Sequence, residues 1–204
     1  MQEKDVYAEL SSIRNLMERS SKFISLSGLA GILAGVYALA GARMAFRILT
    51  NHQEIGAPAD NLQVIRPAMI LIGLAVFVLS AITAYILTVR KARKKNENVW
   101  NPVSRRMLAA IAFPMITGGL VMGILIIKDA YTFIPSACLI FYGLALVAGS
   151  QYTYSDVKWL GIGQILLGLL ALYLPGYGGL LMWTIGFGAL HILYGTIMYF
   201  KYDR

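Results

Sequence analysis

The chain has 204 residues, of which 58% are hydrophobic and 14% are charged, and its net charge is +8. Soluble globular domains have about 25% charged residues, so this composition excludes an ordinary soluble domain. Six apolar stretches approach the roughly 20 residues that cross a bilayer. They are Phe23–Ala42, Pro67–Leu87, Met107–Ile127, Phe133–Gly149, Trp159–Leu174 and Gly179–Phe200. The sequence therefore predicts an all-α integral membrane protein, with a six-helix transmembrane domain over residues 23–204.

Residues 1–22 precede the first apolar stretch and have a helical pattern of their own. Val6, Leu10, Ile13 and Met17 recur at spacings of four, three and four residues, which places them on one face of a helix. We predict an amphipathic helix that lies on the cytoplasmic face of the bundle or on lipid headgroups. A docking site for a soluble protein partner is the alternative.

Basic residues are concentrated in alternate loops. The two ends of the chain, the second loop and the fourth loop hold 14 Lys and Arg residues, and the other three loops hold 4. Cytoplasmic loops carry the excess of Lys and Arg in membrane proteins. We therefore predict that both termini are cytoplasmic, in a multi-pass protein of the bacterial cytoplasmic (inner) membrane.

The first loop is predicted to cover Arg43–Arg66 on the outside, with a break at Gly56–Pro58. Loops of this length are often functional. His52 lies in this loop, but its segment holds no second His, Cys or acidic cluster at a metal-binding spacing. We predict no metal site.

The second loop holds a cluster of basic residues, which are Arg90, Lys91, Arg93, Lys94 and Lys95. Such a cluster sets the orientation of the helices and attracts anionic lipid headgroups at about 1 kcal/mol per residue. Recognition of an acidic cytoplasmic protein is the alternative. Nucleic-acid binding is not predicted, because the cluster lacks a folded module and interleaved stacking residues.

Small residues recur along the first span at Ala30, Ala34, Ala38 and Ala42. Rows of this kind let neighbouring helices approach closely, within one chain or in a homo-oligomer. The six-helix plan, the cytoplasmic ends and the alanine row together resemble the substrate-binding S components of energy-coupling-factor vitamin transporters. In that family the alanine rows of the first helix are used for docking, and no residue role is carried over to this chain. The resemblance includes no substrate motif, and no specific family is recognised.

Pro114 interrupts the third span. Proline removes a backbone donor and should leave the carbonyl of Ala110 without its helical partner. The sequence predicts a kink at this point, and loosened helices line cavities in transporters.

His191 is the ionisable residue placed deepest in the membrane, about halfway along the last span, on a face that includes Thr184. Ionisable residues at this depth are functional candidates. Gln164 lies 13 residues before Tyr177, at the centre of the turn between the last two spans, and His191 lies 14 after it. Residues equally distant from a hairpin turn share a depth, so we predict that Gln164 and His191 are neighbours. They form either a structural hydrogen bond or a ligand or proton site.

Function is less constrained than fold. The sequence lacks a zinc-protease motif, a P-loop and a nucleophile elbow, so neither catalysis nor a cofactor is predicted. The leading hypothesis is a protein that binds or transports a small, largely apolar ligand within the helix bundle, at His191, Gln164, Thr184 and Pro114. The alternative is a regulatory or scaffolding protein that works through residues 1–22 and the basic cluster.

The predicted orientation can be tested with reporter fusions at both ends and at Asn61. Because of the 14 to 4 distribution of basic residues, fusions at the two ends should give cytoplasmic signals and the fusion at Asn61 an external one. An external signal at either end would contradict the assignment.

Overall fold

The structure, a computed structural model, describes residues 27–54, 62–96, 98–174 and 177–203. The amphipathic helix predicted for residues 1–22 lies outside this part of the chain. The described residues are helical and contain no strand. Six helical segments are long and apolar enough to cross a bilayer, as the sequence predicts.

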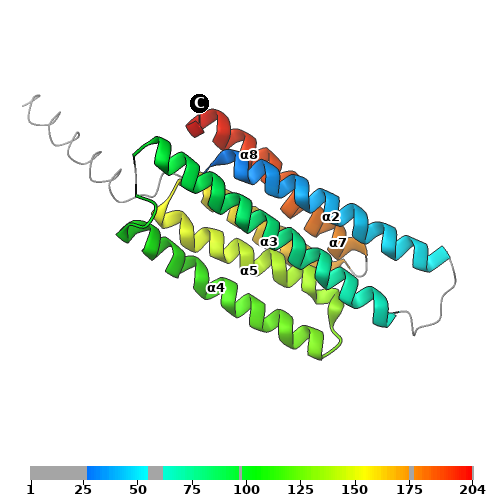
Figure 1. Ribbon diagram of the computed structural model, residues 1–204. Coiled ribbons are helices and arrows are strands. Elements are labelled where there is room, and N and C mark those ends of the chain that lie inside the picture. Colours follow the sequence, from blue (N-terminus) through cyan, green and yellow to red (C-terminus); the bar gives the residue numbers. More distant parts are fainter. Residues whose placement is uncertain (1–26, 55–61, 97, 175–176, 204) are drawn as a thin grey trace, which may run out of the picture.

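The helices run antiparallel to one another in chain order (Figure 1). The α-helices are α2 (Gly28–Glu54), α3 (Leu62–Lys94), α4 (Pro102–Ile127), α5 (Ile134–Gly149), α6 (Asp156–Tyr173), α7 (Tyr177–Trp183) and α8 (His191–Met198). Short 3₁₀ turns flank α5, namely η2 (Tyr131–Phe133) and η3 (Ser150–Tyr152). The last span also includes two π-helical segments, η4 (Thr184–Leu190) and η5 (Tyr199–Asp203).

The loop predicted over Arg43–Arg66 is too long, because helix occupies much of it: α2 continues to Glu54 and α3 begins at Leu62. α2 has 27 residues, and at about 1.5 Å per residue it is about 40 Å long. A bilayer core is only about 30 Å thick. The helix therefore continues beyond the residue at which the apolar stretch ends.

The second loop is shorter than predicted for a similar reason. α3 ends at Lys94, and α4 begins at Pro102 after a capping box. The amide of Ser104 donates to the Asn101 side chain at 2.8 Å, and the amide of Asn101 donates to Ser104 Oγ at 3.0 Å. Four of the five residues of the basic cluster therefore belong to the end of helix α3, and Lys95 follows directly after it.

The helices follow one another in space in an order that differs from the chain order. α2 packs between α3 on one side and α8 with η4 on the other. α6 joins this group to α5, and α5 packs against α4. α3 and α4 therefore flank the bundle, and few residues of their apolar windows are buried.

Two helix crossings are close because glycines meet there. A Cβ atom at Gly195 of α8 would lie 2.5 Å from the Ile32 nitrogen and 2.7 Å from the Gly28 carbonyl oxygen in α2. A Cβ atom at Gly143 of α5 would lie 2.6 Å from the Gly161 carbonyl oxygen in α6. Glycines in these positions bring the two backbones into contact, as is common between membrane helices.

The alanine row of the first span lies largely inside the bundle. Ala30, Ala38 and Ala42 are buried. Three of the four alanines of the row therefore pack within the chain.

One end of the bundle is joined by Asp203, near the C-terminus. Its carboxylate accepts the amide of Gly28 at 2.8 Å and the hydroxyl of Ser27 at 3.3 Å, and so caps α2. Its other oxygen pairs with Lys91 of α3, and both side chains are nearly buried. Lys91 also lies over the ring of Tyr154, 5.7 Å from the centroid. Three segments far apart in the sequence therefore meet at one carboxylate.

Gly195→Ala tests the α2–α8 crossing. The new methyl group would meet backbone atoms that cannot rotate away, so we expect a loss of stability of about 1–3 kcal/mol. Gly119→Ala in α4 is the matched control, since nothing lies within 4 Å of a Cβ atom there. Because alanine favours helix over glycine, the control should unfold at an equal or higher temperature. Equal thermal unfolding of the two variants in detergent would contradict the crossing.

Candidate functional site

The predicted pairing of Gln164 and His191 is confirmed. Gln164 Nε2 lies 3.3 Å from His191 Nδ1, although the two residues belong to different helices. Gln164 is completely buried and His191 is 5% exposed. Equal distance from the hairpin turn therefore identifies the two neighbours.

The carbonyl oxygen of Gly186 contacts both residues of this pair. It lies 2.9 Å from His191 Nδ1 and 2.8 Å from Gln164 Nε2, which donates to it. A carbonyl oxygen only accepts, and a neutral imidazole has one donor and one acceptor nitrogen, so His191 Nδ1 carries the proton and donates to Gly186. Gln164 Nε2 and His191 Nδ1 are then both donors, and they meet by sharing this acceptor, not by a hydrogen bond to each other. Nε2 is then the acceptor, and it receives the hydroxyl of Tyr142 at 2.9 Å. Gln164, His191, Gly186 and Tyr142 form one polar network that ties α5 and α6 to the last span.

Gly186 lies in the π-helical segment η4, and its lack of a side chain is required. A Cβ atom there would lie 2.5 Å from Gln164 Oε1 and 2.5 Å from Leu139 Cδ2. π-helical segments are rare and often occur at functional sites. Here the segment presents a carbonyl to two buried side chains, those of His191 and Gln164.

Aromatic rings enclose the imidazole. The ring of Phe187 is nearly parallel to that of His191 at a centroid distance of 5.7 Å, and the ring of Tyr142 lies 5.5 Å away. Trp183 contacts Phe187 at 5.1 Å. The network is therefore packed on several sides by side chains of the protein itself.

The other two predicted residues lie apart from the network. The hydroxyl of Thr184 donates to the carbonyl of Leu180, one turn earlier in its own helix, at 2.7 Å. Pro114 lies inside α4 and lines a groove between α4 and α5. The structure thus brings together two of the four residues, Gln164 and His191.

The sequence prediction missed Tyr142, although the same reasoning could have found it. Tyr142 lies 11 residues before Thr153, in the connection between α5 and α6, and Gln164 lies 11 residues after it. Equal distance from this second turn places them at one depth. The chain has 12 tyrosines, so the residue type alone does not single out Tyr142.

The groove between α4 and α5 has a volume of about 360 Å³. Its lining residues are Phe113, Pro114, Thr117, Phe141, Leu144, Val147 and Ala148. The hydroxyl of Thr117 donates to the carbonyl of Phe113 at 2.9 Å, so the lining presents an almost entirely apolar surface. Phe113 is 77% exposed and Leu144 is 41% exposed, which places the groove on the outer surface of the bundle.

Helix α5 connects the groove and the network. Phe141 lines the groove and packs against Gly118 of α4, where a Cβ atom would lie 2.5 Å from Phe141 Cβ. The next residue, Tyr142, is about 100° further around the helix axis, and its hydroxyl bonds to His191. The hydrogen bond of Tyr142 therefore restrains the rotation of α5 and with it the orientation of Phe141 in the groove wall.

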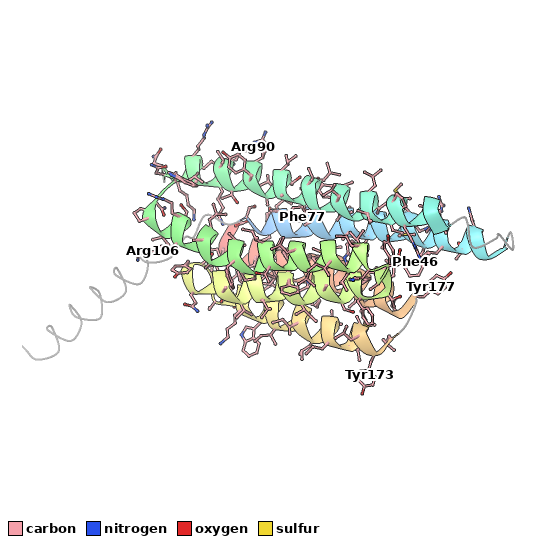
Figure 2. The ribbon with its side chains drawn as sticks, turned by 90° about the horizontal axis from the view of Figure 1, so that it is seen from below. Phe46, Phe77, Arg90, Arg106, Tyr173 and Tyr177 are labelled. Carbon is pink, nitrogen blue, oxygen red and sulfur yellow. The ribbon has the colours of Figure 1, made fainter. Side chains whose placement is uncertain are left out.

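The basic cluster at the end of α3 divides into two kinds of residue. Lys91 pairs with Asp203, whereas Arg90, Arg93, Lys94 and Lys95 are exposed. Figure 2 shows Arg90 and Arg106 toward one end of the bundle and Phe46, Tyr173 and Tyr177 toward the other. Tyrosines such as Tyr173 and Tyr177 are enriched at membrane–water interfaces.

No known protein family matches the chain, and no curated protein or solved structure is similar to it. Within the described ranges, no three His, Cys, Asp or Glu side chains gather where they could hold a metal ion.

A double-mutant cycle tests the hydrogen bond between Tyr142 and His191. Tyr142→Phe and His191→Phe should each lower stability. The double variant should lose less than the sum of the two, by about 0.6 kcal/mol, the average for such bonds between membrane helices. The measurement is reversible unfolding in mixed detergent. Tyr37→Phe is the control partner for His191→Phe, because the Tyr37 hydroxyl contacts Thr83 of α3 instead. Additivity for both pairs would contradict the hydrogen bond.

Proposed function

We propose that this multi-pass membrane protein binds or moves a small, largely apolar ligand, and that the ligand occupies the groove between α4 and α5. The supporting observation is the groove itself. Its volume of about 360 Å³ lies within the range of about 300–1,000 Å³ that is usual for small-molecule sites. Its lining matches an apolar ligand.

The position of the groove favours entry of the ligand from the bilayer. The exposed side chains of Phe113 and Leu144 border the groove, so an apolar molecule dissolved in the membrane reaches it sideways. His191 and Gln164 act differently in this proposal. They position α5, and through it Phe141, while the ligand contacts the apolar wall.

The basic cluster supports the alternative of a regulatory or scaffolding protein. Arg90, Arg93, Lys94 and Lys95 are exposed at the end of α3. They suit contact with anionic headgroups, and a soluble acidic partner has the same chemistry. In both proposals this end of the bundle faces the cytoplasm, because the basic residues gather there.

A photoactivatable long-chain alcohol with a diazirine in its chain tests the groove in the full-length protein. Peptides that contain residues 113–117 and 141–148 should be labelled in a saturable manner, and excess unlabelled alcohol should compete. The lipid-facing surface of α3 should be labelled without saturation, because bulk lipid exchanges there freely.

Two variants sharpen this experiment. Ala148→Phe fills the groove and should abolish the saturable labelling. Ala75→Phe adds the same ring at an exposed position of α3 and should leave the labelling unchanged. Labelling of the groove peptides that no competitor reduces, or that survives Ala148→Phe in a folded protein, would exclude the groove as a ligand site.

A further inference from the structure

Arg106 of α4 lies beyond one end of the groove, on the helix face that lines it. Arg106, Ala110, Phe113 and Thr117 are spaced by four, three and four residues along α4, so they share one face of the helix. Phe113 and Thr117 line the groove, and Arg106 is exposed. Seven residues separate Arg106 from Phe113, which corresponds to about 10 Å along the helix axis. The guanidinium therefore belongs to the face that continues the groove toward the end of the bundle.

The α5 side confirms the direction of the groove. Gly149 lies level with the turn of α4 that follows Arg106, since a Cβ atom there would lie 2.8 Å from Ile111 and 3.9 Å from Met107. Ala148, the residue before Gly149, lines the groove. The groove thus begins about two turns of α4 from Arg106 and continues into the apolar part of the bundle.

Charge at this end favours an anion. Asp156 and Asp203 are paired with Lys201 and Lys91 respectively. Arg105 and Arg106 are exposed at the start of α4, and Figure 2 places Arg106 at the bundle end that Arg90 also marks. Arginine in a headgroup region binds phosphate through two parallel N–H donors.

We propose that the occupant of the groove is one acyl chain of an anionic phospholipid, with its phosphate held by Arg106. This proposal rests on the proposed function and names the class of its ligand. A groove of about 360 Å³ fits a single flexible chain, whereas a partner helix is about 10 Å wide. The distance of about 10 Å between Arg106 and Phe113 along the helix axis lets Arg106 contact the phosphate while Phe113 contacts the hydrocarbon chain of the same lipid.

Native mass spectrometry of the full-length protein tests the headgroup. The protein is incubated with equal amounts of phosphatidylglycerol and phosphatidylcholine that carry identical acyl chains. Wild-type protein should retain more phosphatidylglycerol. Arg106→Gln should reduce the ratio of bound phosphatidylglycerol to phosphatidylcholine about fivefold, since one basic residue contributes about 1 kcal/mol to anionic-lipid attraction. Arg106→Lys keeps the charge and should retain most of the preference.

Arg47→Gln is the matched control. It removes the same charge from an exposed position on α2, which packs against α3 and α8 and lies outside the basic cluster, and it should leave the lipid ratio unchanged. Equal effects of Arg47→Gln and Arg106→Gln would overturn the role of Arg106, because they would show a general surface charge effect. Each variant is first shown to keep the wild-type unfolding temperature, so that a change in the lipid ratio does not result from loss of the fold.

Ala148→Phe separates the two proposals. Loss of both lipids in this variant, with an unchanged ratio in Arg106→Gln, would overturn the headgroup assignment and leave the apolar groove in place. Unchanged binding of both lipids in Ala148→Phe would exclude the groove itself. If the wild-type protein instead shows the mass of a dimer, and Ala148→Phe abolishes that mass, the occupant of the groove is a second copy of the chain and not a lipid.

Discussion

The carbonyl of Gly186 is the point on which the interior of this bundle depends. In a hydrocarbon environment a polar group must find its partner inside the protein, and this oxygen accepts from both His191 and Gln164. The imidazole can then use its second nitrogen for Tyr142. One backbone atom thereby fixes the last span, α6 and α5 relative to one another.

The constraint extends to the outside of the protein through α5. A helix held by Tyr142 on its inner face cannot rotate freely, so Phe141 stays against Gly118 and the groove keeps its shape. A buried polar network and an exposed apolar groove are therefore parts of one arrangement. The network supplies orientation, and the groove supplies the surface on which an apolar molecule can lie.

Much of this arrangement follows from the sequence, because membrane helices obey few rules. Hydropathy locates six helices, and equal distance from a turn locates His191 beside Gln164. Helix ends are harder to predict, since α2 continues past the apolar residues to Glu54. The groove is not predictable from one sequence. It depends on the contact between Gly118 of α4 and Phe141 of α5, and no pattern in the sequence indicates that these two residues pair.

The basic residues show how tertiary structure assigns different roles to similar side chains. Lys91 lies within a run of cations and looks like its neighbours in the sequence. It is nonetheless drawn into the bundle by Asp203, from the far end of the chain, where it helps to close α2 against α3. A nearly buried carboxylate needs such a partner, because an unpaired charge there would cost several kcal/mol. The neighbours of Lys91 in the run, Arg90, Arg93, Lys94 and Lys95, are exposed and remain accessible to anions from outside the protein. Folding therefore separates a cation that holds the bundle together from cations that stay on its surface.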